Sequence, residues 1–324
     1  MIVVLTKTRD VHADEVEARL RSRGAAFVRF DPRDAGITPI AVERDGRMRL
    51  GAIDLDEVSA VWLRRPGAPR AGPDVDDAAM RRYVELELEL LVDGIWESLD
   101  CAWLPGRYPE IRRADHKLGQ LRLASELGFV VPPSLITNDA RELVRFFEEQ
   151  GGALISKLAS PAVFWTEPRV AIRYTQIVTL ADLGYATQTL RHAPMLFQKR
   201  IDKALEVRVT VVGDRVFAAE IDTQRNARTV VDSRTDFSTT HYDVHALPSS
   251  IEARCRTLTR RSGLSYSTID LIVTPEGDYV FLELNPNGQY LWIEQRTGLA
   301  ISDAIADLLI DCEVRHDQRS RHAI

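Results

Sequence analysis

The sequence predicts a multidomain protein of the α/β (α+β) class. The chain has 324 residues, which is too long for one small core and indicates two or three domains. Its N-terminal segment follows the order strand, helix, strand, which is typical of a parallel α/β unit. Its second half contains pairs of apolar strands joined by short glycine turns, which predict antiparallel hairpins.

The composition is that of an ordinary globular chain and excludes several function classes. Hydrophobic residues make up 45% and charged residues 28%, and the formal net charge is −6. The arginines alternate with acidic residues and form no basic stripe, so we expect no nucleic-acid partner. The seven histidines form no HExxH motif, and the sequence therefore indicates no zinc site.

Cysteine usage and hydropathy predict a cytoplasmic protein. The three cysteines, Cys101, Cys255 and Cys312, lie far apart without metal-ligand spacing, which fits a reducing compartment. The opening MIVVLTKTRD has no basic region before its apolar run, and it predicts a first strand rather than a signal peptide. No apolar stretch is long enough to span a bilayer, so we expect no membrane partner.

Residues 1–108 are expected to form an N-terminal α/β domain. The Asp45-Gly46 pair predicts a hairpin inside it. Gly24 is suited to end the first helix. The expected strands are Met1–Lys7, 26–30 and Ser59–Gly67, and the expected helices are Asp10–Arg23 and Asp76–Leu99. The long helix should carry one apolar stripe, formed by Tyr83, Leu86, Leu90 and Ile95.

Residues 109–195 are expected to form a central subdomain. The segment ALISKLAS predicts a buried strand, whereas Ser160–Arg173 lacks a clean period and predicts a loop. Glycine and proline pairs mark the ends of two helices. These helices are expected at Ile111–Leu127 and Asp139–Gln150.

Residues 196–312 are expected to form a C-terminal subdomain, followed by a charged, frayed tail at 313–324. It should contain the strand MLFQKRI, a hairpin that turns at Gly213-Asp214 and a second hairpin in STIDLIVTPEGDYVFLELN. Thr223–His245 is polar and predicts an irregular segment. The expected helices are Ser249–Ser262 and Leu299–Leu309.

The last hairpin places acidic residues within an apolar strand. With Glu276-Gly277 as a two-residue turn, Asp270 lies directly opposite Glu283, and Asn285 shares the face of Glu283. Two facing carboxylates repel each other unless a cation lies between them. Mg²⁺ suits such a pair, because it prefers a few carboxylates and completes its shell with water and phosphate. Asp270, Glu283 and Asn285 therefore form a candidate magnesium site.

A simpler interpretation has Asp270 and Glu283 facing solvent, where nearby arginines would pair with them. The flanking residues argue against a freely solvated face, because a strand that is hydrophobic on both sides of its acids is usually buried. These neighbours are Ile269, Leu271, Phe281, Leu282 and Leu284.

Positive groups for phosphate are the second requirement of such a site. Only five of the 42 basic residues are lysines. Lys157 lies in a predicted buried strand, where a lysine is costly unless an anion meets it. Lys117 lies in a predicted helix, and a solvated helix lysine is the simpler interpretation.

Glu206 and Arg208 alternate along one face of the strand EVRVTVV. A carboxylate can accept hydrogen bonds from two ribose hydroxyls, and an arginine can hold a transferring phosphoryl group or an acyl phosphate. A plain cross-strand ion pair is the alternative for these two residues.

The ordered set of these features resembles the ATP-grasp ligases between about Arg112 and Leu309. The set comprises a helix lysine, a GFVVPPS segment, a strand lysine, a Gln-Lys strand end, a Glu-x-Arg strand and a hairpin with Asp, Glu and Asn. No GxxxxGK[ST] motif is present, which disfavours a P-loop. The segments VWLRRPG, ADHKLGQLRLASELGFVVPPSLITN, MLFQKRIDKALEVRVTVVG and FLELNPNGQYLWIEQRTGL resemble one branch, the graspetide (ω-ester-containing peptide) synthetases of the actinobacterial type.

The resemblance implies an ATP-grasp fold, preceded by a pre-ATP-grasp domain, with ATP and Mg²⁺ as cofactors. Lys117 and Lys157 would hold the ATP phosphates, and Glu206 would bind the ribose. Arg208 would steady the γ-phosphate and the acyl phosphate. The adenine pocket would be lined by Gln198, Lys199, Arg200 and Ile201.

The family pattern is not complete in this chain. Ser160–Arg173 contains no glycine where many ATP-grasp enzymes carry a glycine-rich flap. Asp232-Ser233-Arg234 stands where the branch usually has Asp-Trp-Arg, and Arg234 remains a candidate catalytic residue.

The resemblance implies that a precursor peptide is the substrate and that the enzyme is a homodimer. The enzyme would phosphorylate Asp or Glu side chains of the peptide and join them to Thr or Ser hydroxyls, or to Lys amines, with ester formation favoured. Thr223–His245, with Arg225 and Arg228, is a candidate docking segment, and Arg64 and Arg65 are further candidates for substrate contact. The alternatives are a ligase that adds an amino acid to a small molecule or a protein C-terminus, and a nucleotide-binding module without catalysis.

Overall fold

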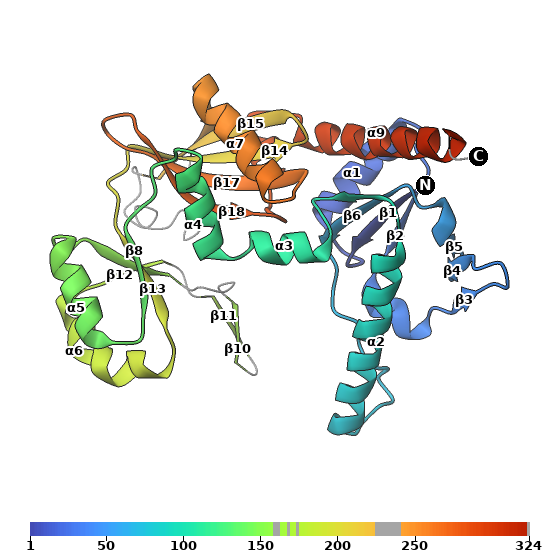
Figure 1. Ribbon diagram of the computed structural model, residues 1–324, viewed down its shortest axis with the longest axis horizontal. Coiled ribbons are helices and arrows are strands. Elements are labelled where there is room, and N and C mark those ends of the chain that lie inside the picture. The colour runs from blue at the N-terminus through green and yellow to red at the C-terminus, as the bar shows by residue number, and fades with distance from the viewer. Residues whose placement is uncertain (158–162, 167–168, 173–174, 224–240, 323–324) are drawn as a thin grey trace.

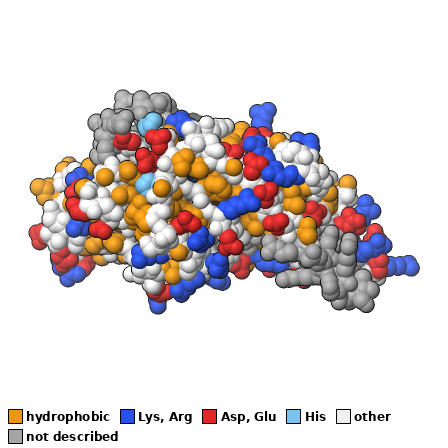
Figure 2. Space-filling view, turned by 90° about the horizontal axis from the view of Figure 1, so that it is seen from above, with side chains coloured by type: hydrophobic (Ala, Val, Ile, Leu, Met, Phe, Trp, Pro, Cys, Tyr) orange, Lys and Arg blue, Asp and Glu red, His pale blue; other side chains and the backbone are white. Residues whose placement is uncertain are grey.

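The computed structural model describes residues 1–157, 163–166, 169–172, 175–223 and 241–322 (Figure 1). A parallel sheet lies at the N-terminal end, an antiparallel sheet forms the central part, and a third sheet is formed by the C-terminal half. The mixed α/β class predicted from the sequence is confirmed. In the space-filling view, basic and acidic side chains are interspersed over the visible face (Figure 2).

The N-terminal sheet has the strand order β2-β1-β6-β7, and its strands are parallel. The predicted strand–helix–strand unit is present, with Asp10 capping its helix and Gly24 at a φ of 70°. The last strand was not predicted. The elements are β1 (Ile2–Thr6), α1 (Val11–Ser22), β2 (Phe27–Phe30), β6 (Ala60–Arg65) and β7 (Ala102–Leu104).

A small antiparallel sheet, β3-β4-β5, flanks this domain. The hairpin predicted at Asp45-Gly46 joins its first two strands, with Gly46 at a φ of 89°. Two short 3₁₀ helices border it. The elements are η1 (Pro32–Ile37), β3 (Ile40–Val42), β4 (Met48–Leu50), β5 (Ile53–Asp54) and η2 (Leu55–Glu57).

Helix α2 (Ala78–Ser98) forms where predicted, but most of its apolar stripe is exposed. Ile95 is buried, whereas Tyr83, Leu86 and Leu90 are 59%, 44% and 63% exposed. The helix projects beyond the sheet, so only its C-terminal third has a surface to pack against (Figure 1). Periodicity identified the apolar face correctly but could not show whether anything covers it.

The single helix predicted at Ile111–Leu127 is in fact two helices, α3 (Tyr108–Ala114) and α4 (Lys117–Glu126). His116 has an extended backbone (φ −74°, ψ 105°), which ends the first helix and starts the second. Lys117 therefore occupies the first position of α4 rather than the middle of a helix.

The central sheet has the order β12-β9-β13-β8, and its own core contains Leu143, Leu154 and Phe197. The segment predicted as a loop at Ser160–Arg173 contains an antiparallel hairpin, because Val163–Thr166 pairs with Arg169–Ile172 without any glycine. The elements are β8 (Ser134–Thr137), α5 (Ala140–Glu149), β9 (Leu154–Lys157), β10 (Val163–Thr166), β11 (Arg169–Ile172), β12 (Gln176–Ile177), α6 (Leu180–Thr189), η3 (Leu190–His192) and β13 (Met195–Lys199).

The C-terminal sheet has the order β16-β15-β14-β17-β18, and all its neighbours are antiparallel. Both predicted hairpins are present. Residues 241–244 of the segment predicted to be irregular form a strand. The elements are β14 (Leu205–Val212), β15 (Arg215–Asp222), β16 (His241–Val244), α7 (Ser249–Arg261), β17 (Tyr266–Val273) and β18 (Tyr279–Asn285).

Two helices complete the chain, α8 (Leu291–Thr297) and α9 (Ile301–His322). The expectation of a frayed tail at 313–324 is wrong for residues 313–322, because α9 continues to His322. The helix extends from the C-terminal sheet across the N-terminal domain (Figure 1). Beyond the predicted end, Ile310 and Cys312 pack against the hydrophobic core that β1 and β6 also line, and the N-terminal amine of Met1 pairs with Glu313 at 3.0 Å.

The N-terminal and C-terminal sheets share one hydrophobic core. This core combines residues of β1 and β6 with residues of β14, β17, α8 and α9. Examples are Ile2, Val4, Trp62, Val212, Tyr266, Ile293 and Ile305. The boundary proposed near residue 108 therefore does not separate two independent cores.

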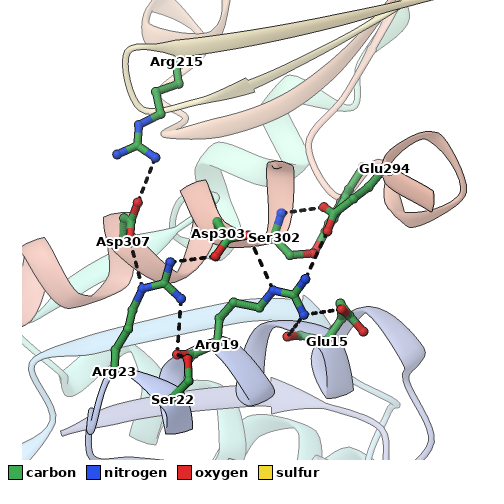
Figure 3. A network of polar contacts seen from close by, with 10 residues as sticks. Glu15, Arg19, Ser22, Arg23, Arg215, Glu294, Ser302, Asp303 and Asp307 are labelled. Atoms are coloured by element: carbon green, nitrogen blue, oxygen red, sulfur yellow. Dashed lines mark hydrogen bonds and ion pairs between the residues drawn. The ribbon is translucent and has the colours of Figure 1, made fainter. Parts of the chain in front are cut away.

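An ion-pair network lies beside this shared core, between α1 and α9 (Figure 3). Arg23 contacts Asp303 at 2.7 Å and Asp307 at 3.1 Å, and Arg19 contacts Asp303 at 3.6 Å. Arg215 of β15 also contacts Asp307, at 2.8 Å. Arg23, Asp303 and Asp307 are about one third exposed, so each pair contributes modestly to stability.

We expect Arg23→Ala to lower the free energy of unfolding by about 1 kcal/mol, because it removes two partly shielded pairs. Near 1 M salt the loss should shrink, since the screening length falls to about 3 Å. Chemical denaturation at both salt concentrations measures this. Arg47→Ala is the matched control, because Arg47 is 59% exposed and its ion pairs with described residues, Glu43 and Asp45, lie within its own hairpin. An equal loss in both variants would contradict a role in joining α1 to α9.

Candidate active site

The acidic hairpin forms with the predicted pairing, although its turn differs. Asp270 lies opposite Glu283, and Thr268 lies opposite Asn285. The turn has three residues (275–277) rather than two, because the Thr274 N–H donates to the Asp278 carbonyl at 3.0 Å and closes the hairpin one residue earlier, and Gly277 adopts a φ of 91°. A bulge between Asp270 and Leu271 offsets the register by one residue. The two deviations cancel, so the acids still face each other.

Each of the two acids has a basic partner from a different element. Arg208 on β14 donates from Nη1 to both Asp270 oxygens, at 2.6 and 2.7 Å. Lys117, at the start of α4, lies 3.2 Å from Glu283 Oε2. The Asp270 and Glu283 side chains are 24% and 28% exposed, and so they do not form a freely solvated face.

The amide of Asn285 completes the cluster. Its Nδ2 faces Asp270 Oδ2 at 3.4 Å and Glu283 Oε1 at 3.3 Å. Burial raises the pKa of Asp270; Arg208 lowers it, and the adjacent Glu283 raises it further. The site therefore holds two acids that repel each other and depend on nearby positive charge.

Gln120, which the sequence did not suggest, fixes α4 against β18. Its side chain is buried and donates from Nε2 to the carbonyls of Ala114 (2.6 Å) and Leu284 (2.7 Å). Its Oε1 accepts the backbone N–H of Leu284 at 3.0 Å. This bridge places Lys117, one turn before Gln120, beside Glu283. A polar residue on a helix face gives no sequence signal for such a long-range role.

The loop after β18 is packed tightly against β17. A Cβ added to Gly288 would lie 1.7 Å from Thr268 Oγ1, so only glycine fits there. Tyr266 donates its hydroxyl to the Gly288 carbonyl at 2.7 Å, and burial raises the pKa of Tyr266 to about 12. Tyr266 therefore stays a protonated donor at neutral pH.

Glu206 lies two residues before Arg208 on β14 and is paired with Lys203. The cross-strand ion pair given as the alternative does form for Arg208, which pairs with Asp270 on the neighbouring strand β17, whereas Glu206 pairs with Lys203 just before its own strand. Glu206 remains close enough to Asp270 to raise its pKa. It therefore lies at the edge of the acidic cluster.

The remaining candidates of the nucleotide site lie on the central sheet or just beyond it. Lys157 ends β9, and Gln198 on β13 is buried and donates to Ser134 Oγ at 2.9 Å. The backbone N–H groups of Lys199 and Arg200 donate to Pro133 and Ala153. Ile201 follows the strand. These residues group together on the central sheet, separately from the acidic cluster.

Three arginines singled out from the sequence lie outside the described residues. They are Arg225, Arg228 and Arg234. Arg64 and Arg65, in contrast, lie at the end of β6 and contact the loop after β18, with distances of 3.1 and 3.3 Å to the Asn287 carbonyl.

A cavity of about 560 Å³ lies apart from the acidic cluster, between α2, β7 and α3. Its lining includes Trp96, Trp103, Arg107 and Tyr108, and it reaches His116 directly before Lys117. None of the predicted nucleotide or metal residues lines it.

The donor set fits a magnesium ion. Among the described residues no group of three or more His, Cys, Asp and Glu could hold a metal. Two carboxylates and an amide oxygen suit Mg²⁺, which binds through one or two carboxylates together with phosphates. Turning the Asn285 amide would direct its oxygen between the acids.

No family model matches the chain, and no curated protein matches it. Solved structures do match. The D-alanine–D-alanine ligase of Bacillus anthracis covers 98% of both chains with a TM-score of 0.59 at 14% identity, and this likeness concerns the fold alone. With the basic–acidic cluster at the end of the C-terminal hairpin, the fold defines an ATP-grasp ligase, and the chain is an ATP-dependent ligase of this class.

Two closer structures identify the branch. The macrocyclase MdnC of Microcystis aeruginosa MRC, bound with precursor peptide MdnA, is 30% identical with a TM-score of 0.84 and covers 96% of this chain and 99% of its own. A RiPP-associated ATP-grasp ligase of Chryseobacterium gregarium, in complex with ADP and a leader and core peptide, is 30% identical with a TM-score of 0.88 and covers 96% of both chains. The chain belongs to this family of RiPP-associated ATP-grasp ligases. The predicted resemblance is confirmed, while the actinobacterial type stays a prediction.

Gly288→Ala should destabilise the loop after β18 by about 2 kcal/mol or more, because its Cβ would overlap Thr268. Thermal and chemical unfolding measure the effect. Gly94→Ala is the matched control: Gly94 lies inside α2 with nothing within 4 Å, so alanine there should stabilise the helix by up to about 1 kcal/mol. A Gly288→Ala variant as stable as the wild type would show that this loop is not packed as described.

Proposed function

We propose that this enzyme is an ATP-dependent macrocyclase that acts on a ribosomally made precursor peptide. It phosphorylates Asp or Glu side chains of the peptide and joins them to Thr or Ser hydroxyls as esters, or to Lys amines as amides. The proposal is supported chiefly by the similarity, along nearly the whole chain, to a macrocyclase bound with its precursor peptide. The three free cysteines fit a reducing cytoplasm.

The reaction has two steps, phosphorylation of a carboxylate and ring closure. A peptide carboxylate oxygen attacks the γ-phosphorus of ATP, the bond from that phosphorus to the bridging β,γ-oxygen breaks, and ADP leaves with the electron pair. The hydroxyl oxygen of a second side chain then attacks the acyl carbon of the acyl phosphate. Phosphate departs and takes up the hydroxyl proton, so each ring costs one ATP and releases the equivalent of one water from the peptide.

The residues of the acidic cluster suit the first step. Lys117 and Arg208 place two positive charges beside the position where phosphoryl charge develops, in a partly buried site where electrostatic stabilisation is strong. Lys157 approaches the phosphates from the central sheet. Gln198, Lys199, Arg200 and Ile201 line the adenine pocket, Glu206 binds the ribose, and Arg234 contacts the peptide.

Asp270, Glu283 and Asn285 would hold Mg²⁺, which would neutralise charge on the phosphate oxygens when bound. The protein's own part is to keep these three ligands at fixed positions. The Gln120 bridge and the Gly288–Thr268 packing do so from opposite sides of β18.

The experiment that tests this function is a mass measurement on a candidate precursor peptide encoded beside the gene. With enzyme, ATP and Mg²⁺, the peptide should lose one water per ring. Asp270→Ala should abolish the loss, because it removes a metal ligand and the partner of Arg208. Asp278→Ala, an exposed aspartate at the turn of the same hairpin, is the control and should remain active.

Two results would contradict the proposal. A gain in mass by an added amino acid would favour the ligase that extends small molecules or protein C-termini. Full activity of Asp270→Ala, with its fold confirmed by circular dichroism, would remove the metal assignment.

The enzyme is further proposed to form a homodimer through α2. Met80, Tyr83, Leu86 and Leu90 form one apolar face and are 44% to 63% exposed. Basic residues lie near the start of the helix and acidic ones near its end. Two such helices packed antiparallel would bring Arg82 close to the partner's Glu89, so the face is complementary to itself.

Leu86→Glu should convert the dimer to a monomer, because it places two carboxylates together near the centre of the paired helices. Light scattering after size exclusion measures the mass. Leu180→Glu, at a position that is 75% exposed on α6, should leave the dimer intact. A wild-type protein that is monomeric at tens of micromolar would contradict this interface.

A further inference from the structure

Two adjacent arginines of the N-terminal domain are directed at the loop that follows the candidate metal ligands. Arg64 is 3% exposed and donates from Nη1 to the Asn287 carbonyl at 3.1 Å. Arg65, which is exposed, donates from Nη2 to the same carbonyl at 3.3 Å. With its amide nitrogen turned toward β6, Asn287 donates in return to the carbonyls of Leu63 (2.9 Å) and Arg64 (3.0 Å).

Three successive carbonyls of this loop each accept a side-chain donor. The Asn287 carbonyl accepts Arg64 and Arg65, the Gly288 carbonyl accepts Tyr266, and the Gln289 carbonyl accepts Arg208 at 3.2 Å. The loop therefore holds three guanidinium groups around itself. All three guanidinium groups lie close enough to the buried Tyr266 for their positive charge to lower its pKa, against the larger upward effect of burial.

The positive charge of this group exceeds the negative charge that faces it. Arg208 is paired with Asp270, and Arg64 lies 3.9 Å from Asp10. Arg65 has no ion pair among the residues that the structure describes, and only one of its five N–H donors is assigned there. His12, which packs beside Asp10, adds no positive charge, because burial and Arg64 lower its pKa to about 4.

Two donors in this group also lack a partner. The Nε atoms of Arg64 and Arg208 are buried without a hydrogen bond in the described part of the chain. A buried donor without a partner is costly, and an anion is the ligand that can satisfy several guanidinium donors together.

The three guanidinium groups lie where the phosphoryl acceptor, the peptide carboxylate, would be expected to bind. In phosphoryl transfer the attacking oxygen approaches in line, on the side of the γ-phosphate away from ADP. The central sheet, which carries Lys157 and Gln198, lies on one side of the C-terminal sheet, and the N-terminal sheet with Arg64 and Arg65 lies on the other (Figure 1).

We propose that Arg65, supported by the buried Arg64, binds the side-chain carboxylate of the acidic peptide residue that becomes phosphorylated. This inference deepens the proposed function and depends on it for the identity of the substrate. Arg65 supplies a planar, paired set of donors that matches a carboxylate. Arg64 and Asn287 hold its backbone and the loop in place.

The test uses a small probe, N-acetyl-glutamate methylamide, together with its uncharged analogue N-acetyl-glutamine methylamide. Binding to the full-length enzyme is measured by ligand-observed NMR in the presence of ADP and Mg²⁺. The wild type should bind the glutamate probe about tenfold more tightly than the glutamine probe, as expected for a charge-assisted hydrogen bond. In Arg65→Ala this preference should disappear, and Arg65→Lys should keep part of it.

Arg44→Ala is the matched control, because Arg44 is an exposed arginine in the β3–β4 hairpin. This variant should keep the full preference for the glutamate probe over the glutamine probe. The proposal is overturned if the wild type shows no preference, or if Arg65→Ala retains it. A variant that instead loses affinity for a nonhydrolysable ATP analogue would also overturn it, because Arg65 would then be a phosphate ligand. Failure of the wild type to cyclise any peptide would contradict the proposed function alone, since the probe binds without turnover.

Discussion

Two carboxylates that face each other across β17 and β18 impose the central electrostatic constraint on this fold. Asp270 and Glu283 are less than one third exposed, so water alone does not screen their repulsion. Arg208 from β14 and Lys117 from α4 supply the compensating charge. The acidic pair therefore requires three strands and one helix to meet at one point, and the Gln120 bridge fixes that helix in place.

The N-terminal domain is part of this arrangement. It shares a hydrophobic core with the C-terminal sheet, and its β6 strand clamps the loop after Asn285 through Asn287. The ion pairs of Arg19 and Arg23 with α9 provide a second, more exposed link. The candidate metal ligands are thus connected to the N-terminal sheet by a short segment in which the carbonyls of Asn287, Gly288 and Gln289 accept side-chain donors. The central sheet has a small core of its own, which includes Leu143, Leu154 and Phe197.

The sequence predicted most strands of the N-terminal and C-terminal sheets and the facing acids, because both follow from short-range alternation, but it missed β7, β16 and the β10–β11 hairpin. The pairing of Asp270 with Glu283 came from an incorrect two-residue turn, and it holds because a bulge compensates. The break at His116 was missed, since neither Asp115 nor His116 is a strong helix breaker. Gln120, Tyr266 and Asn287 could not be identified, because their roles depend on contacts with residues far away in the chain.

The ion pairs of the acidic cluster also suggest how the site prepares for its substrates. In the structure, Arg208 and Lys117 neutralise the two acids that are proposed to receive the metal. A divalent cation held there would neutralise the two acids in place of these side chains. Both basic groups would then be available to the phosphate oxygens of the nucleotide. The acids would exchange their basic partners for the cation, and the basic side chains would exchange the acids for phosphate. Each partly buried charge thus has an opposite charge beside it both before and after the substrates bind, so the site can be formed in advance.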